Sequence, residues 1–352
     1  MHHQSFPYAA MSSFLPTQYP LLQAPMAGAQ DQRLAVAVGR AGGLGSLPAA
    51  MLSADALQVA LTELRESGLP HNVNFFCHTQ PHADTEALAR WRACLAPYAQ
   101  ALGLNQSAAA GGGSRRPFDD EMAEVLEDFS PDVVSFHFGL PDARLLARVR
   151  ARGSRVLSSA TTLREALWLQ AHGADAVIAQ GLEAGGHRGH FLDTDPGQQH
   201  PTLSLLPMLV EALDVPVIAA GGIGTADDVQ QAMALGAEAV QVGTAFLCCD
   251  EAKTGALHRA RLMDLDAPTA LTNLFSGGLA RGLFNRLIRE QGPVSPHAPP
   301  FPLASADLAP LRAAAEAQGL DDFTPLWSGT NRRGCIAAPA AEVVARLMAT
   351  TA

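Results

Sequence analysis

Short apolar runs that end in glycine or another small residue recur up to about residue 250, and helix-like segments separate them. Several runs are continuously apolar, which is typical of parallel strands buried on both faces. The runs are Leu21–Ala27, Gly43–Leu47, His71–Phe76, Val133–Phe138, Arg155–Ser159, Ala176–Gln180, Pro216–Ala220 and Ala239–Ala245. The pattern predicts parallel strands that are joined by helical crossovers.

The segments between these runs have helical periodicity, and most of them share one stop signal. The clearest segments are Asp31–Ala41, Ala54–Ser67, Asp142–Ala151, Thr162–His172 and Thr225–Leu235. A glycine follows four of them, at Gly42, Gly153, Gly173 and Gly236. Glycine adopts the left-handed conformation that ends many helices at no steric cost, so we predict helix ends there.

Strands that alternate with helices can form a closed barrel or an open doubly wound sheet. The open sheet would normally carry a G-x-G-x-x-G fingerprint after its first strand, and the chain contains none. Gly43-Leu44-Gly45 has Pro48 where the third glycine should be. We therefore favour an α/β fold of the (β/α)8 TIM-type barrel class over residues 18–250, with the open sheet as the alternative.

The remaining segments interrupt or flank this alternation. Residues 78–130 are long for one crossover and predict an insertion, and residues 1–17 predict a flexible leader without signal-peptide features. Residues 251–338, which include a proline-rich stretch, predict a smaller, mostly helical C-terminal domain or lid on the substrate side. Residues 339–350 are amphipathic and predict a closing helix of the barrel.

Composition narrows the classes of function. The chain has 352 residues, 48% of them hydrophobic, and a formal charge of −10 without a basic stripe, so we expect no nucleic-acid partner. Its five cysteines form no C-x-x-C pair, which indicates a reduced, cytoplasmic setting without disulfides. No apolar stretch reaches membrane-spanning length, and no cluster has metal-ligand spacing. The sequence leaves an oligomer possible.

The ends of the last two predicted strands contain the strongest local signal. Gly221-Gly222-Ile223-Gly224 leads into a helix whose start, Thr225 with Asp228, is typical of a capping box. Gly243-Thr244 follows the next strand. Together they predict a barrel phosphate cradle of uncovered backbone N–H groups at a helix N-terminus. Alternatively, these glycines only allow tight turns.

A second glycine-rich loop surrounds one histidine. Gly185, Gly186 and Gly189 flank His187 and Arg188 after the sixth predicted strand, where barrel active sites are built. Imidazole exchanges protons near neutral pH, so we predict His187 as the catalytic residue rather than a solvated loop histidine.

Other polar residues at strand ends have two possible roles, one in ligand binding and one in the structure of the barrel. His137 could line the pocket or be a satisfied core histidine, whereas His78, His82 and His190 are expected on the surface. Asn74 and Gln180 could bind a ligand or tie neighbouring strands together.

These strand ends together resemble the bacterial nitronate monooxygenases, formerly called 2-nitropropane dioxygenases. The matching segments are Gln23–Gly28, Asn72–Phe76, Ala179–Gly181, Glu183–Gly189, Ala219–Gly224 and Gln241–Thr244, in order and spacing. The stretch Glu-Ala-Gly-Gly-His-Arg-Gly after a strand ending in Gln is the most specific of them. The resemblance covers residues 18–250 well and the rest loosely.

The resemblance implies bound FMN and an enzyme that oxidises nitronates with oxygen to carbonyl compounds and nitrite, with nitroalkanes as a second candidate substrate. Met26 and Ala27 would lie against the flavin, with Asn74 and Gln180 at its polar edge or ribityl chain. The phosphate region would be held by Gly185, Gly222, Gln241, Val242, Gly243 and Thr244. His187 would act beside the flavin.

The chain departs from the family pattern at the substrate end. Some members place tyrosine and lysine there from the C-terminal part, but Tyr98 is the last tyrosine here and Lys253 is the only lysine. An anionic substrate would then need an arginine. The candidates are Arg188, Arg281, Arg286 and Arg332. We select His137 and Arg188 as the candidate substrate residues.

Two other functions remain open. An NAD(P)H-dependent FMN enoyl or quinone reductase would share the glycine-rich histidine loop. A flavin-binding barrel without turnover would need only the cradle.

Overall fold

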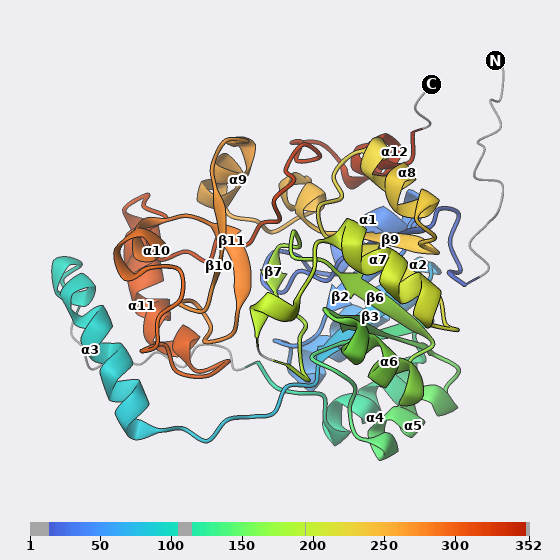
Figure 1. Ribbon diagram of the computed structural model, residues 1–352, viewed down its shortest axis with the longest axis horizontal. Coiled ribbons are helices and arrows are strands. Elements are labelled where there is room, and N and C mark those ends of the chain that lie inside the picture. Colours follow the sequence, from blue (N-terminus) through green and yellow to red (C-terminus); the bar gives the residue numbers. More distant parts are fainter. Residues whose placement is uncertain (1–13, 105–114, 194, 350–352) are drawn as a thin grey trace.

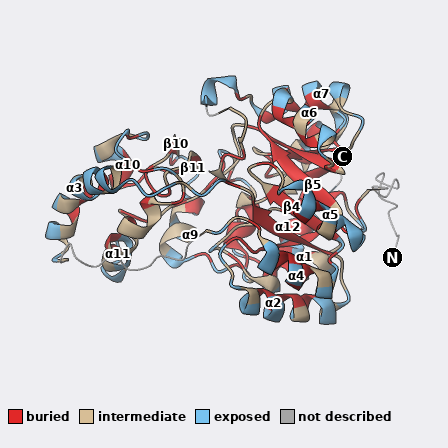
Figure 2. Cartoon of the chain, turned by 90° about the horizontal axis from the view of Figure 1, so that it is seen from below, coloured by how far each residue is buried: buried red, intermediate tan, exposed pale blue. Residues whose placement is uncertain are grey.

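The computed structural model describes residues 14–104, 115–193 and 195–349, and it shows a larger and a smaller body (Figure 1). The larger body contains a sheet of strands surrounded by helices. The smaller body contains helices and a short antiparallel sheet, and it lies beside the barrel in both views (Figures 1 and 2).

The larger body is a closed parallel barrel, as predicted. Its strands are β1 (Leu21–Gln23), β2 (Gly45–Pro48), β3 (His71–Phe76), β4 (Val133–His137), β5 (Arg155–Ala160), β6 (Ala176–Gln180), β8 (Val217–Ala220) and β9 (Ala239–Val242). The 8-stranded sheet has the order β1-β9-β8-β6-β5-β4-β3-β2. A parallel bridge between Leu22 and Leu44 joins its two end strands. There Leu44 N–H donates to Leu21 O at 2.8 Å, and Gln23 N–H donates to Leu44 O at 2.9 Å.

Helices on the outside of the barrel follow the predicted alternation. They are α1 (Gln32–Arg40), α2 (Ala54–Ser67), α4 (Asp120–Phe129), α5 (Ala143–Ala151), α6 (Leu163–Ala171), α7 (Thr202–Ala212), α8 (Ala226–Ala234) and α12 (Ala340–Leu347). Their outward faces are exposed while the strands are buried (Figure 2). The four predicted stop glycines, Gly42, Gly153, Gly173 and Gly236, all have φ between 84° and 99°.

The start of α8 confirms the predicted capping box. Thr225 Oγ1 accepts from Asp228 N–H at 3.3 Å, and the Asp228 carboxylate accepts from Thr225 N–H at 2.9 Å. This reciprocal pair satisfies two backbone donors that a helix N-terminus leaves open. It fixes the exit of β8, where the glycine-rich turn lies.

The predicted leader is partly a structural element. Residues 1–13 lie outside the described residues, but Leu15 is only 2% exposed and packs inside the barrel. Its neighbours there include Val133 and Leu157, near the beginnings of their strands. Leu15 therefore belongs to the core at the N-terminal end of the barrel, and Thr17 is buried as well, contrary to the expectation of a leader through residue 17.

The smaller body draws on distant parts of the chain. It contains α3 (Thr85–Ala101), α9 (Ala256–Met263), α10 (Arg286–Gln291), α11 (Ala304–Ala317), and a sheet of β10 (Thr269–Thr272), β11 (Ala280–Leu283) and β7 (Gly186–His187). The C-terminal segment expected to be helical thus also supplies two strands.

The predicted insertion at residues 78–130 divides between the two bodies. Helix α3 leaves the barrel and packs against α11, where the buried Trp91 donates from its indole Nε1 to Ala304 O at 3.3 Å. Helix α4 returns to the barrel wall beside α2 and α5. A long crossover is needed because the chain visits the second body between β3 and β4.

The last helix, α12, packs against α1 and α8 on the barrel wall. No helix among the described residues is long and apolar enough to cross a membrane.

Candidate active site

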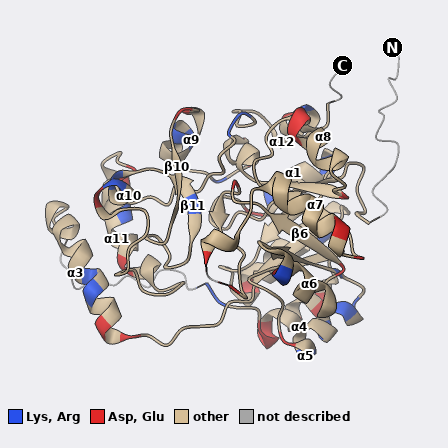
Figure 3. Cartoon of the chain, viewed as in Figure 1, with Lys and Arg blue, Asp and Glu red and all other residues tan. Residues whose placement is uncertain are grey.

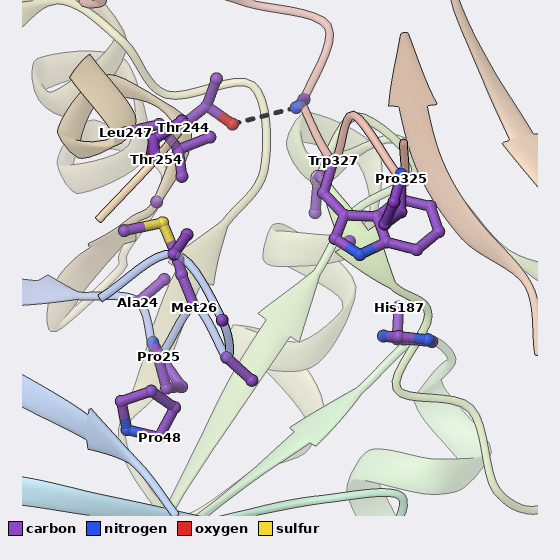
Figure 4. Close-up of a pocket in the computed structure, with 18 of the residues that line it drawn as sticks. Ala24, Pro25, Met26, Pro48, His187, Thr244, Leu247, Thr254, Pro325 and Trp327 are labelled. Carbon is purple, nitrogen blue, oxygen red and sulfur yellow. Dashed lines mark hydrogen bonds between the residues drawn. The ribbon is translucent and has the colours of Figure 1, made fainter. Parts of the chain in front are cut away.

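A cavity of about 620 Å³ lies at the C-terminal ends of the strands, where the barrel meets the smaller body. This is the end at which barrel enzymes place their active sites, and the volume suits a small-molecule ligand. In Figure 4, His187 and Trp327 lie on one side of the cavity, and Ala24, Pro25 and Met26 lie on the other.

His187 is held at the junction of the two bodies. Its backbone forms β7, which pairs antiparallel with β11, so that His187 lies opposite Ala280. Its carbonyl oxygen accepts from Gln180 Nε2 at 2.9 Å and lies 3.1 Å from His137 Nε2. A histidine fixed from both sides has little freedom to leave the cavity wall.

The His187 ring has one polar contact and several aromatic ones. Its Nε2 lies 2.8 Å from Ser276 Oγ. The rings of Phe76, Phe301 and Trp327 lie 6.3, 5.1 and 5.4 Å from it, centroid to centroid. These surroundings exclude water from much of the imidazole.

Burial holds the pKa of His187 well below its usual value of 6.5, and the nearby positive charge of Arg115 lowers this pKa further. His137, His78 and His190 act in the same direction. The ring is therefore neutral at neutral pH, which is the form that can accept a proton.

Two predicted site residues line the cavity but are used to position the histidine loop. Gln180 donates to His187 O, and its Oε1 accepts from Gly189 N–H at 2.8 Å. His137 contacts Ser159 Oγ through Nδ1 and His187 O through Nε2, both at 3.1 Å. Burial lowers the pKa of His137 to about 4, so it is neutral too.

Arg188 does not reach the cavity. It is 0% exposed, and its guanidinium donates to Gln199 Oε1 at 2.7 Å and to the carbonyls of Gly181 and Gln180 at 2.6 and 2.8 Å. All these contacts lie inside the loop. The expectation that Arg188 contacts the substrate is therefore wrong.

The other arginines expected to bind substrate also have partners elsewhere. Arg281 donates to Leu182 O, and Arg332 donates to the carbonyls of residues 264, 265 and 267. Arg286 forms ion pairs with Glu290 and Asp322.

The glycine-rich turns that predict a phosphate cradle line the cavity, but two of their backbone N–H groups already have a partner. The Asp228 carboxylate accepts from Gly224 N–H at 3.0 Å and from Thr225 N–H, so an inner carboxylate already occupies those donors. Gly222 has φ 74°, which a side chain would strain. The backbone around Gly222 and Gly243 remains at the cavity wall.

A C-terminal segment, residues 328–334, crosses this cradle. Gly329 N–H donates to Thr244 Oγ1 at 2.9 Å, the dashed line of Figure 4, and Asn331 Nδ2 donates to Gly222 O at 2.9 Å. A Cβ on Gly185 would lie 2.5 Å from Gly329 N. Gly185 is therefore required for the crossing of two backbones, a reason that the local sequence did not reveal.

Met26, Ala27 and Asn74, which the resemblance places beside the flavin, also line the cavity. Met26 N–H donates to Gln30 Oε1 at 2.9 Å, which fixes this turn from behind. Asn74 Nδ2 donates to Ser135 Oγ at 2.9 Å, so it also ties β3 to β4.

Of the residues expected at the phosphate end, Gln241, Gly243 and Thr244 line the cavity. The Val242 side chain is 1% exposed and packs into the core between strands and helices, so it could contribute only through its backbone.

Sequence reasoning missed three residues near His187. Ser276 contacts its ring, Arg115 lines the cavity, and His78 is 9% exposed instead of lying on the surface. All three lie outside the strand ends that the pattern singled out. Only Arg115 could have been suspected from the sequence, because it is a positively charged residue where the long insertion leads back to the barrel.

Charged side chains are scattered over both bodies and form no basic stripe in the view of Figure 3. Within the described ranges, no group of three or more His, Cys, Asp or Glu side chains could hold a metal ion.

Comparison with known proteins agrees with this geometry. The family model described as "Nitronate monooxygenase" matches residues 9–350. A nitronate monooxygenase of Paraburkholderia phytofirmans is 38% identical over 342 residues, covering 96% of this chain and 93% of that protein.

Two solved structures are similar in fold. A nitroalkane oxidase from Streptomyces ansochromogenes has a TM-score of 0.85 and 41% identity, covering 94% of this chain and 95% of that one. FabK from Thermotoga maritima has a TM-score of 0.68 and 24% identity, covering 96% and 94%, and shows a shared fold. The chain belongs to the nitronate monooxygenase family of oxidoreductases.

Proposed function

We propose that this protein oxidises nitronates with oxygen to carbonyl compounds and nitrite, with FMN as its cofactor. The observation that carries the proposal is a neutral, half-buried His187 that lines a cavity at the C-terminal end of the barrel strands. When bound, FMN supplies the electron transfer between substrate and oxygen.

The described residues fit a flavin mononucleotide. The cradle of Gly222, Gly243 and Thr244 offers backbone groups at one end of the cavity, and Met26 and Ala27 offer an apolar wall. Gln241 lines the same space, and its buried Oε1 has no hydrogen-bond partner among the described residues. A ligand N–H or O–H would satisfy that acceptor. The single cradle, without a dinucleotide fingerprint, favours FMN over FAD.

The contact with Ser276 supports the role of His187 as a base. Ser276 Oγ lies 3.3 Å from Gly278 O and can donate to it, which leaves the hydroxyl oxygen able to accept from His187 Nε2–H. The ring proton then sits on Nε2, and the lone pair of Nδ1 is free to take a carbon-bound proton. Ser276 is thus a positioning residue, and His187 is the catalytic one.

The proposal is tested on purified holoenzyme. We expect a yellow protein that releases FMN on denaturation, consumes oxygen and forms nitrite from nitronates without NAD(P)H. His187→Asn should retain the flavin but lose about 100- to 10,000-fold in turnover of neutral nitroalkanes, which must first lose a proton. A preformed nitronate has already lost it, so its rate should fall less.

Other outcomes assign other functions. Flavin reduction that requires NAD(P)H, with nitronate and nitroalkane rates equally unaffected by His187→Asn, would make the protein a reductase. Bound flavin without turnover of either substrate would make it a carrier.

A further inference from the structure

Arg115 differs from the other cationic residues around the cavity. Within the described ranges, the Lys and Arg side chains that line the cavity are Arg115, Lys253 and Arg312. Lys253 pairs with Asp31 at 3.5 Å, and Arg312 pairs with Glu316 at 2.7 Å. Arg115 forms no ion pair in the described part of the chain, and residues 105–114 contain no Asp or Glu.

The position of Arg115 is fixed by its neighbours. Gln80 Nε2 donates to Arg115 O at 3.1 Å, and Arg116 N–H donates to Ala50 O at 3.3 Å. Pro117 forms a parallel bridge with Phe76, at the end of β3. The side chain therefore starts from the same barrel end as the His187 loop.

One aromatic ring connects Arg115 to His187. The Arg115 guanidinium carbon lies 6.0 Å from the centroid of the Phe301 ring, and the His187 ring lies 5.1 Å from the same centroid. Arg115 is also the largest charged influence on His187. Arg115 is half-buried at the cavity and has no carboxylate partner among the described residues, so its guanidinium keeps donors for an anionic ligand.

We propose that Arg115 binds the anionic O–N–O group of the nitronate and orients its carbon toward His187. This inference rests on the proposed function. A guanidinium presents parallel N–H donors that match two oxygens on one atom, as in carboxylates. A chain with a net charge of −10 needs such a local site to attract an anion. The positive charge of Arg115 also disfavours protonation of His187. The same charge would therefore bind the anion and keep the base in its neutral form.

The neighbouring Arg116 provides a matched control. Its side chain is 53% exposed and forms ion pairs with Asp119 at 2.7 Å and Glu121 at 3.2 Å. Arg116→Gln removes the same charge one residue away, at the surface.

The first measurement needs no turnover. Oxidised holoenzyme is titrated with nitrate, a planar oxyanion that cannot reduce flavin, and the visible flavin spectrum is followed. We expect saturable perturbation in the wild type, about 10- to 100-fold weaker binding in Arg115→Gln, and unchanged binding in Arg116→Gln. Arg115→Lys keeps the positive charge but lacks the two parallel N–H donors, so its affinity for nitrate should lie between those of the wild type and Arg115→Gln. Nitrate that does not bind the wild type, or binds Arg115→Gln equally well, would overturn the proposal.

The second measurement tests whether Arg115 binds the two oxygens of the nitronate group or another anionic group of the substrate. The KM for ethylnitronate should rise about 10- to 100-fold in Arg115→Gln, with a smaller change for neutral nitroethane. An effect confined to nitronates that carry a separate carboxylate would contradict the assignment. If the wild type turns over no nitronate, the proposed function fails, while the nitrate titration still decides whether Arg115 is an oxyanion site.

Discussion

Ser276→Ala tests whether the orientation of His187 matters for proton abstraction. The mutation removes the 2.8 Å contact with His187 Nε2 and leaves the ring in contact with the rings of Phe301 and Trp327. Ser276 Oγ stabilises the tautomer of His187 that is protonated on Nε2. Without this acceptor the preference is lost, and part of the enzyme population has the ring proton on Nδ1. In that tautomer Nδ1 is protonated, so it cannot accept a proton from the substrate.

The expected loss follows from the number of contacts removed. One neutral hydrogen bond contributes about 0.5–1.5 kcal/mol, which corresponds to about 2- to 13-fold in kcat/KM. The loss should appear with neutral nitroalkanes and be smaller with preformed nitronates, which need no base. It should also be well below the loss in His187→Asn, because the imidazole remains.

The assay compares nitrite release from nitroethane and ethylnitronate at several pH values, with flavin content measured for each variant. Ser295→Ala is the matched control, because Ser295 is also a buried serine of the smaller body and its Oγ accepts from His297 N–H, away from His187. Equal losses with both substrates would indicate a role in binding. An unchanged nitroethane rate with full flavin occupancy would refute the tautomer argument.

Two further predictions concern the cofactor and acid stability. Gly243→Val should lower flavin affinity about 10-fold while the far-ultraviolet circular dichroism stays unchanged, because the new Cβ would lie 3.2 Å from the Ala24 Cβ at the cavity wall; a full flavin-to-protein ratio after gel filtration would contradict this. Because burial lowers the pKa of His137 to about 4, the unfolded chain binds a proton between about pH 6.5 and 4 that the folded chain does not. This contribution to the free energy of unfolding is full above pH 6.5 and should fall by about 2 kcal/mol at pH 5 for this ring alone, which urea unfolding at pH 7 and 5 measures; equal midpoints would contradict it.

The sequence was sufficient to predict the barrel because each strand is a contiguous run, and burial on both faces leaves an unbroken apolar signature. The positions of His187 and of the glycine-rich turns at the cavity could be predicted because glycines and a helix cap are local features. The position of α3 could not be found in this way. Its apolar residues, such as Trp91, would suit any surface, and only the tertiary structure shows that the surface is α11.

The error at Arg188 has the same origin. Its neighbours in sequence suggest a functional arginine, but three acceptors in the folded loop take its donors. Arg115 was overlooked because no motif surrounds it. It stands out because it has no ion-pair partner among the described residues, which is a property of its three-dimensional surroundings.

The excursion of α3 into the smaller body has a consequence for protein engineering and for the history of the gene. A single cut near residue 250 would give an N-terminal fragment whose α3 has no α11 to cover Trp91, and a C-terminal fragment whose core lacks that tryptophan. Neither fragment would be a module that can be grafted onto another enzyme. Recombination that exchanged substrate-side bodies between related barrels would need at least three coordinated crossovers, one on each side of α3 and one after β9. Such bodies are therefore expected to diversify by point substitution within the same chain and not by shuffling.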